Sequence, residues 1–322
     1  MSKYVVTGNA GFIGSHLTDR LLSDGHTVVG IDNLSTGFRE YLPKHPNFTF
    51  LELDITDWPA LARHGTYFKG ASCVFHLAAF ARIQPSVFNP SLTHDTNVTG
   101  TLNVLELMRL VGIKNIVYSA SSSYYGKKAV IPSRENDAND CQTPYSVSKY
   151  MGELLCSAWS KTYGINNARL RYFNVWGPRS PLSGPYSPIV SKFFRQALLD
   201  KSDMTVVGDG LQKRDFTYVD DVVDANIKAA AYLSSTPGQL DRALNIGTGK
   251  NYTILKLANM VNESVIRADG RPANIEHIPE RVGEAQESRA DNTEAERVLG
   301  WVPKYSLEQK IDELRDYYIA MK

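Results

Sequence analysis

The sequence has few cysteines, no long apolar run and almost no net charge, and each shortage excludes a class of function. Its 322 residues carry 35 Lys and Arg against 34 Asp and Glu. Because we find no basic stripe, we do not expect nucleic acid to be a partner. No apolar run approaches the roughly 18 residues that a membrane helix needs, so we do not expect a membrane to be a partner either.

Cysteine and histidine are too sparse to suggest disulfides or a metal site. Cys73, Cys141 and Cys156 are odd in number and lack metal-ligand spacing, so we expect reduced thiols. The seven histidines form no His-x-x-His or His-Glu-x-x-His pattern, so we expect no catalytic metal. An apolar strand begins by Tyr4, which leaves no room for a signal peptide. These features predict a cytoplasmic protein.

A glycine-rich turn lies at the start of the chain. The β-branched run Lys3–Thr7 predicts a buried strand. Gly8, Gly11 and Gly14 follow at three-residue spacing and lead into an amphipathic stretch over residues 12–22. This order makes a pyrophosphate site, because free backbone N–H groups and the helix dipole face the anion. The spacing differs from the Gly-x-Gly-x-x-Gly of the dehydrogenase fingerprint, and glycine is common in turns of any kind.

A carboxylate at the end of the second predicted strand, Thr27–Ile31, favours a dinucleotide. Asp32 lies about 20 residues past the glycine run, where it can accept hydrogen bonds from an adenosine ribose. Because a carboxylate would repel a 2′-phosphate, we expect NAD rather than NADP. The alternative is that Asp32 only caps the turn that follows it.

Predicted strands alternate with predicted helices through Phe173. The helices are residues 11–23, 59–69, 91–111 and 144–163, and the further strands are residues 48–53, 72–77 and 115–118. This alternation predicts an α/β fold with a doubly wound, Rossmann-like parallel sheet and a smaller C-terminal α/β substrate-binding domain. Later elements are a helix at 219–233, a strand at 243–246 and a helix at 306–320. The predicted domains are residues 1–178 plus 216–249 for the cofactor and residues 179–215 plus 250–322 for the substrate.

Tyr145 and Lys149, in the run Thr-Pro-Tyr-Ser-Val-Ser-Lys, are candidate catalytic residues for a cofactor bound at the glycine turn. Pro144 can open a helix, so the two side chains fall on one face, one turn apart. A free tyrosine has a pKa of about 10, and a nearby ammonium group favours the phenolate and lowers that pKa. Tyr145 is therefore a candidate proton acceptor beside a hydride carrier. Alone, a Tyr-x-x-x-Lys pattern is typical of a solvated helix face.

Together with Asp32 and the glycine turn, the Tyr145 motif resembles the extended short-chain dehydrogenase/reductases. The segments that share this resemblance are His76-Leu77-Ala78-Ala79, Asn97, residues 119–126, residues 171–179, Gly208-Asp209-Gly210, Arg214-Asp215-Phe216 and Arg281-Val282-Gly283-Glu284. The later segments are similar to the nucleotide-sugar branch, and the resemblance covers essentially the whole chain. Within this branch, the sequence looks most like the 4-epimerases that act on UDP-hexoses.

The resemblance implies bound NAD and chemistry at C4 of the sugar. Tyr145, as phenolate, would take the 4-hydroxyl proton while C4 gives a hydride to NAD, and Ser121 would relay the proton. Lys149 would hold the ribose. The 4-keto sugar would then turn over and take the hydride back on its other face, so that NAD is recycled. The predicted cofactor contacts are Gly8, Gly11, Phe12, Ile13, Asp32, Asn33, Ser35, Thr36, Gly37, Asp54, Ile55, Leu77, Ala78, Ala79, Asn97, Tyr145, Lys149 and Tyr172.

Substrate contacts follow from the same resemblance. Arg214 and Arg281 would bind the diphosphate, since planar guanidinium groups suit phosphate oxygens, although surface ion pairs are the alternative. Dehydratases and decarboxylating enzymes of this branch use acidic residues where this chain has Ser122 and Ser123, so we do not expect their reactions. The predicted substrate contacts are Ala81, Ser121, Ser122, Ser123, Tyr145, Asn174, Val190, Val206, Gln212, Arg214, Arg281, Glu284 and Ser288.

Ser288 carries the prediction of substrate size. It lies in a stretch, residues 287–291, that matches a family segment next to the sugar C2 substituent, where some epimerases have a tyrosine that excludes N-acetylated sugars. Because serine leaves room for an acetamido group, the resemblance implies activity on UDP-GlcNAc and UDP-GalNAc, alongside UDP-Glc and UDP-Gal. The alternative is that Ser288 caps the following helix.

Other functions stay open. A uronate 4-epimerase should place a strong donor near C5 of the sugar, and no residue announces that role. A 4-ketoreductase would consume NADPH, against which Asp32 argues. A non-catalytic NAD-binding regulator has no need of Ser121, Tyr145 and Lys149 together.

The helices at 91–111 and 144–163 carry apolar stripes that are typical of a core. In the family that the chain resembles, the equivalent helices form the four-helix bundle of a dimer. The resemblance therefore implies a homodimer.

Overall fold

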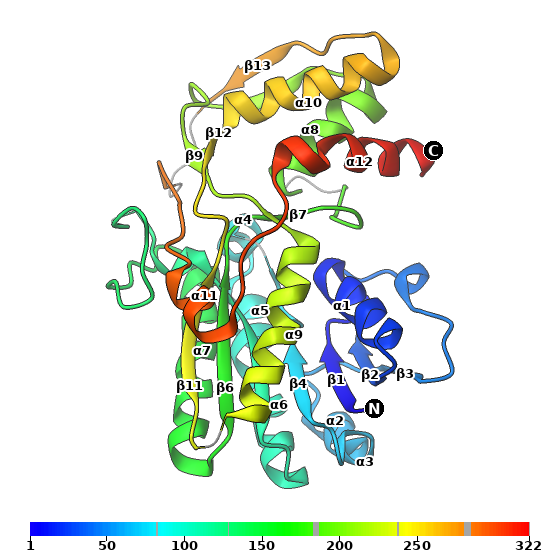
Figure 1. Ribbon diagram of the computed structural model, residues 1–322, viewed down its shortest axis with the longest axis vertical. Coiled ribbons are helices and arrows are strands. Elements are labelled where there is room, and N and C mark those ends of the chain that lie inside the picture. Colours follow the sequence, from blue (N-terminus) through cyan, green and yellow to red (C-terminus); the bar gives the residue numbers. More distant parts are fainter. Residues whose placement is uncertain (82, 128, 183–186, 237, 280–284, 322) are drawn as a thin grey trace.

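The apolar, β-branched runs of the sequence form a seven-stranded parallel sheet in the order β11-β6-β5-β4-β1-β2-β3 (Figure 1). In this computed structural model, the described residues are 1–81, 83–127, 129–182, 187–236, 238–279 and 285–321. The strands are β1 (Lys3–Thr7), β2 (Thr27–Asp32), β3 (Phe48–Glu52), β4 (Cys73–His76), β5 (Asn115–Ser121), β6 (Asn166–Tyr172) and β11 (Asp241–Ile246). The predicted doubly wound α/β fold is confirmed.

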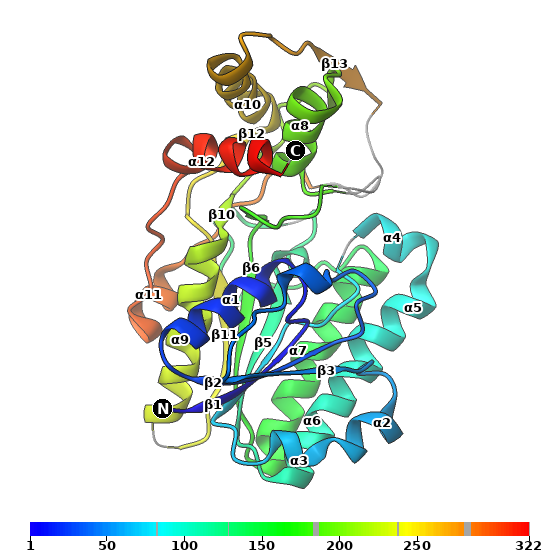
Figure 2. The same ribbon diagram turned by 90° about the vertical axis from the view of Figure 1, so that its right-hand side faces the viewer.

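Helices cover both faces of the sheet (Figures 1 and 2). One face carries α1 (Phe12–Ser23), α9 (Val219–Ser235) and α11 (Thr293–Leu299). The other carries α2 (Trp58–Arg63), α3 (Gly65–Phe68), α4 (Ile83–Phe88), α5 (Pro90–His94), the π-helical turn η2 (Asp95–Thr99), α6 (Gly100–Val111) and α7 (Pro144–Tyr163). Side chains of successive β1 residues point to opposite faces of the sheet. Val5 packs in the core under α6, and Val6 packs in the core under α1 and α9.

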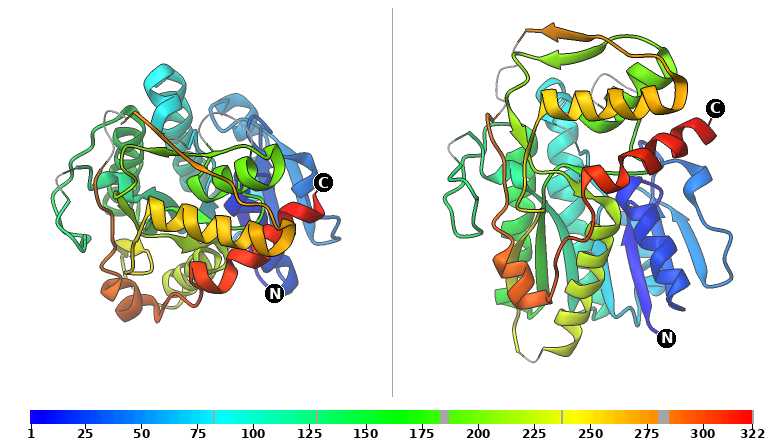
Figure 3. Two further views of the ribbon diagram at one scale, coloured as in Figure 1. Left: turned by 90° about the horizontal axis from the view of Figure 1, so that it is seen from above. Right: turned by 45° about the horizontal axis from the view of Figure 1, so that its top comes forward.

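A smaller lobe lies over the carboxyl ends of the strands, as the tilted view shows (Figure 3). Its elements are α8 (Ile189–Phe194), the π-helical η4 (Arg195–Asp200), β8 (Met204–Val207), β9 (Lys213–Arg214), β12 (Tyr252–Thr253), α10 (Ile254–Asp269), β13 (Ile275–Ile278) and α12 (Leu307–Ala320). Phe193, Leu257 and Leu314 are among the buried residues of its own core. The short strands β7 (Val175–Trp176) and β10 (Thr217–Tyr218) pair where the chain passes between the sheet and the lobe. The exact domain boundaries stay a prediction.

Two elements differ clearly from their predicted bounds. The helix predicted at 59–69 is two short helices, because the helical conformation is interrupted at His64, which lies between α2 and α3. The strand predicted to stop at Tyr118 runs on to Ser121, because residues 119–121 pair with residues 170–172 of β6. Two further turns, the 3-10 helices η1 (Arg39–Tyr41) and η3 (Ser122–Tyr124), follow β2 and β5. The longer β5 brings Ser121 to the same edge of the sheet as the glycine turn.

Candidate active site

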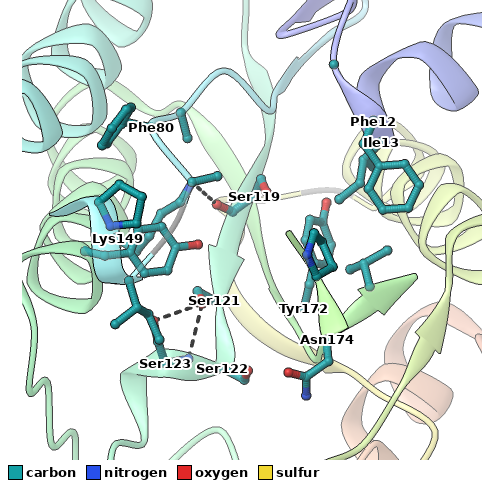
Figure 4. A pocket seen from close by; sticks show the side chains of 18 of the residues that line it. Phe12, Ile13, Phe80, Ser119, Ser121, Ser122, Ser123, Lys149, Tyr172 and Asn174 are labelled. Atoms are coloured by element: carbon teal, nitrogen blue, oxygen red, sulfur yellow. Dashed lines mark hydrogen bonds between the residues drawn. The ribbon is translucent and has the colours of Figure 1, made fainter. Parts of the chain in front are cut away.

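A cleft of about 1460 Å³ lies between the carboxyl edge of the sheet and the smaller lobe. It opens where the chain reverses its winding, between β1 and β4, which is the usual ligand site of an open α/β sheet. The predicted residues that line it are Gly8, Gly11, Phe12, Ile13, Asp32, Asn33, Ser35, Thr36, Asp54, Ile55, Leu77, Ala78, Ala79, Ala81, Ser121, Ser122, Ser123, Tyr145, Lys149, Tyr172, Asn174, Val190, Gln212, Arg214 and Ser288. Figure 4 shows part of this lining.

The glycine turn leaves space that side chains would fill. A Cβ on Gly8 would lie 2.7 Å from the backbone nitrogen of Ala78, and one on Gly14 would lie 2.0 Å from the Gly8 carbonyl oxygen. Gly11 precedes α1 without a side-chain cap, and the first turn of the helix holds no acidic residue. The N–H groups of this first turn and the positive end of the helix dipole therefore stay available to an anion such as a pyrophosphate.

Asp32, the last residue of β2, lies beside the glycine turn. Its carboxylate accepts hydrogen bonds from Ala10 N–H at 3.0 Å and from Leu34 N–H at 2.8 Å. Burial raises the pKa of Asp32, and these two hydrogen bonds oppose the rise. The turn-capping alternative is thus real for Leu34, but the carboxylate also fixes the glycine turn and still lines the cleft.

Asp54 and Asn33 are hydrogen-bonded to each other on the lining of the cleft. Asn33 Nδ2 donates to Asp54 Oδ2 at 2.8 Å, and Thr56 donates to Asp54 through both its N–H and its hydroxyl. Although burial acts to raise the pKa of Asp54, these hydrogen bonds hold it below its usual range. The glycine turn, the uncapped N-terminal end of α1 and the carboxylate of Asp32 together fit NAD.

Three predicted contacts lie elsewhere. Gly37 packs against Ala10 and is not among the described residues that line the cleft. Asn97 is buried and joins Phe80 to Ser148, accepting from Phe80 N–H at 2.7 Å and donating to Ser148 Oγ at 2.9 Å. Val206 lies in the core of the smaller lobe, and its neighbour Val207 lines the cleft instead, because alternate residues of β8 face opposite sides. Arg281 and Glu284 lie outside the described residues.

Helix α7 carries Tyr145 and Lys149 into the cleft. Pro144 opens the first turn, as the sequence predicts, and Thr143 and Ser146 add a reciprocal cap. Lys149 Nζ donates to the Ser119 carbonyl oxygen at 2.8 Å (Figure 4). It also lies 5.2 Å from the centre of the Tyr118 ring. Burial lowers the pKa of Lys149 to about 8, while Cys156 and Glu153 act in the opposite direction.

The pKa of Tyr145 differs from the prediction. Burial raises it, and a hydrogen bond with the Ser121 side chain acts to lower it. The expectation that Lys149 lowers this pKa is therefore wrong for the protein alone. The ammonium group of Lys149 donates instead to the backbone of β5.

Ser121 ends β5 and faces the same space. Its Oγ accepts from Ser123 N–H at 3.2 Å and from Ser123 Oγ at 2.9 Å (Figure 4). The structure therefore brings together the three predicted catalytic side chains, Ser121, Tyr145 and Lys149, on the lining of one cleft.

A buried ion pair supports this wall, and sequence reasoning missed it. Arg171 on β6 donates to Glu153 on α7 through Nε at 2.9 Å and Nη2 at 2.8 Å, and its guanidinium lies 3.6 Å from the centre of the Tyr124 ring. Glu153 follows Lys149 by one helical turn, as Lys149 follows Tyr145. That four-residue spacing was the signal in the sequence.

The far end of the cleft is built by the smaller lobe. Asn174, at φ 25°, donates through Nδ2 to the Asp215 carbonyl oxygen at 2.8 Å and lies 3.4 Å from Ser288 Oγ. Asp215 accepts from Thr248, Gly249 and Ala290 and so holds the turn before Phe216. Gln212 donates to the Val207 carbonyl oxygen. Arg214 lines the cleft from β9.

Comparison with known proteins gives the family. A sequence model described as the NAD dependent epimerase/dehydratase family matches residues 4–247. The chain belongs to this family. It is 36% identical to a UDP-glucose 4-epimerase of Mycolicibacterium smegmatis over 318 residues, which are 98% of this chain and 97% of that protein.

Solved structures of this family share the whole fold. A UDP-glucose 4-epimerase from Thermotoga maritima with UDP-glucose superposes with a TM-score of 0.90 at 34% identity, covering 99% of each chain. A UDP-N-acetylglucosamine 4-epimerase from Methanobrevibacter ruminantium, in complex with UDP-N-acetylmuramic acid, also has a TM-score of 0.90 at 31% identity, covering 100% of this chain and 99% of that one. The expected resemblance is confirmed at the level of the family, whose cofactor is NAD.

Two absences concern the described residues alone. Within them no helix is both long and apolar enough to cross a bilayer. No group of three or more His, Cys, Asp or Glu side chains in the same described ranges is arranged to hold a metal ion.

Proposed function

We propose that this protein interconverts UDP-GlcNAc and UDP-GalNAc, alongside UDP-Glc and UDP-Gal, by oxidation and re-reduction at C4 of the sugar. The observation that carries the proposal is the convergence of Ser121, Tyr145 and Lys149 on one cleft whose other walls fit a dinucleotide and a second large ligand. A structural protein has no need of such a set. NAD, when bound, supplies the hydride acceptor and a positive ring that favours a nearby phenolate.

The side chains have separate tasks. Tyr145 takes the proton of the sugar 4-hydroxyl and returns it when the ketone is reduced. Ser121 donates a hydrogen bond to the oxygen of Tyr145 or of sugar C4, which lets the proton move between them. Lys149, held by the Ser119 carbonyl oxygen, keeps a positive charge on the lining of the cleft, where it would bind ribose hydroxyls of NAD.

The uncharged lining of the cleft beside Ser121 supports epimerisation over dehydration. Ser122 and Ser123 line the cleft next to Ser121, and neither can act as a carboxylic acid or base. Expulsion of water from C5 and C6 needs such a group, and these two positions do not supply one to the 4-keto sugar. With only C4 chemistry available, return of the hydride completes the cycle.

Substrate size rests on the pair Asn174 and Ser288. Both line the far end of the cleft, and Ser288 presents a short side chain there. A serine at that place leaves room for the acetamido group of an N-acetylated sugar. Arg214, on the same wall, is proposed to bind the diphosphate through its planar guanidinium group.

The proposal is tested by incubating the purified protein, without added cofactor, with UDP-GlcNAc, UDP-Glc or UDP-glucuronate and following the anomeric proton by NMR. We expect the galacto-epimers of the first two sugars. Epimerisation of UDP-glucuronate alone would replace the proposed substrate, and no change in any sugar after NAD is supplied would refute epimerase function. Tyr145→Phe is the matched control: it should keep bound NAD and lose turnover.

We also propose a homodimer formed through α6 and α7. The exposed apolar side chains of these helices include Leu110 at 57%, Leu154 at 50% and Val147 at 43%. Exposed apolar residues on neighbouring helices suit burial against a second copy. A two-fold pairing of α6 and α7 would form a four-helix bundle, as the family resemblance implies.

A further inference from the structure

The hydroxyl of Ser121 accepts hydrogen bonds from two donors of one neighbour, Ser123. Ser123 gives it two hydrogen bonds, one from the backbone N–H at 3.2 Å and one from the side-chain Oγ at 2.9 Å (Figure 4). A serine hydroxyl has two acceptor lone pairs and one proton. Because Ser123 occupies both acceptor positions, the remaining capacity of Ser121 is to donate its own proton.

We propose that Ser123 is a positioning residue, which makes Ser121 a one-way donor toward Tyr145 and the oxygen at sugar C4. This inference rests on the proposed function and deepens it. The sequence placed Ser123 among the substrate contacts, whereas here it acts through Ser121 and has no need to touch the sugar.

The two hydrogen bonds from Ser123 are not equivalent. The N–H bond is an ordinary local turn, in which Ser121 caps the short helix η3, and any residue except proline at position 123 can make it. The hydroxyl bond depends on the side chain. Without it, a lone pair of Ser121 becomes free to accept the phenolic proton of Tyr145, and this reversed hydrogen bond would hold the tyrosine in its inactive, protonated form.

The direction of the Ser121 hydrogen bond matters because burial works against the phenolate. Burial raises the pKa of Tyr145, and the hydrogen bond with Ser121 lowers it. The position of Ser121 is itself rigid, because it ends β5 and pairs with Tyr172 of β6. A fixed oxygen with both acceptor sites filled is a reliable donor in every turnover.

The first test compares Ser123→Ala with Ser123→Thr, which keeps the hydroxyl. We expect Ser123→Ala to lower kcat by about tenfold at pH 7 with KM changed by less than about twofold, and Ser123→Thr to restore most of kcat. The acidic limb of the kcat profile should move up by about one pH unit in Ser123→Ala, so that activity recovers at high pH. A rise in KM without a shifted limb would instead make Ser123 a substrate contact and overturn the proposal.

A double-mutant cycle separates action through Ser121 from any other role. In the Ser121→Ala background, adding Ser123→Ala should cost nothing further, because there is no hydroxyl left to orient. A second tenfold loss in that background would overturn the proposal.

A titration without substrate keeps the inference distinct from the proposed function. The difference in near-ultraviolet absorbance between the protein and its Tyr145→Phe variant reports ionisation of Tyr145. Ser123→Ala should move this titration to higher pH and Ser123→Thr should not. If no UDP-sugar is turned over, the proposed function fails, while an unmoved titration refutes the role of Ser123 in either case.

Discussion

Asn174 and Ser288, which lie 114 positions apart in the chain, face each other on the lining of the cleft, with Asn174 Nδ2 3.4 Å from Ser288 Oγ. Asn174 is fixed by its bond to the Asp215 carbonyl oxygen, and the Ser288 N–H donates to the Lys213 carbonyl oxygen. Both are therefore anchored to the turn that carries Arg214. The free volume of the cleft beside this pair is limited by the size of the side chain at position 288.

Ser288→Tyr should close this space selectively. A phenol ring in place of the hydroxymethyl group would occupy the volume needed by an acetamido group, so turnover of UDP-GlcNAc should fall at least about 100-fold, while UDP-Glc turnover changes little. Competition assays with both sugars in one tube, followed by NMR, give the ratio directly. Ser288→Ala is the control and should keep both activities. Equal survival of both activities in Ser288→Tyr would show that position 288 does not gate the substrate.

Gly14→Ala should remove the cofactor. The added methyl carbon would lie 2.0 Å from the Gly8 carbonyl oxygen, and backbone on that side cannot rotate away as a side chain can. The turn must open, which we expect to cost about 1–3 kcal/mol of unfolding free energy and to release NAD during gel filtration. In Gly65→Ala, the nearest atom is the flexible Leu107 Cδ1 at 3.2 Å, so that variant should keep its cofactor. Retained NAD in Gly14→Ala would contradict the role given to the glycine turn.

The sequence predicts those parts of this site whose geometry depends only on residues close together in the chain. The glycine turn between β1 and α1, Asp32 at the end of β2, and the helix start at Pro144 each depend on neighbours within a few residues. Their geometry follows from turn, strand and capping preferences. For the same reason α7 has its predicted bounds.

Contacts between segments that are far apart in the chain could not be predicted from these local patterns. Strand periodicity shows that Val206 and Val207 face opposite ways, but which of them meets the cleft depends on how β8 packs against α8 and α10. Asn97 looked like a cofactor contact, yet its partners Phe80 and Ser148 come from other segments. The direction of the Tyr145 pKa shift likewise depends on burial, which only the folded chain defines.

His76 should make the protein sensitive to acid. Its Nδ1 lies 2.7 Å from Thr7 Oγ1 and its Nε2 lies 2.9 Å from Thr101 Oγ1 in the buried centre of the sheet. Burial, aided by the Lys149 charge, lowers the pKa of His76 to about 3 from its ordinary value of 6.5. Between these values the unfolded chain binds the extra proton, so stability present above pH 6.5 is lost as the pH falls, by about 1.4 kcal/mol per pH unit.

Urea unfolding of His76→Gln between pH 7 and pH 4 tests this contribution. The variant should be less stable than the parent at pH 7, because one amide replaces two ring contacts, but its stability should fall less steeply with acid. His45→Gln, at an exposed histidine, controls for loss of an imidazole. Parallel losses in His76→Gln and the parent would mean that His76 does not cause the acid sensitivity.

Leu154→Glu should separate the proposed dimer into single chains. Leu154 is half exposed on α7, and in a two-fold bundle of α6 and α7 its side chain would be buried against the second copy. An unpaired carboxylate in that position costs about 3 kcal/mol or more, which weakens association at least about 100-fold. Sedimentation velocity should therefore give the mass of two chains for the parent and of one for Leu154→Glu. Ile319→Glu, at a comparably exposed apolar residue of α12, should remain a dimer. A parent that sediments as one chain, or a Leu154→Glu variant that keeps the mass of two, would remove α6 and α7 as the interface.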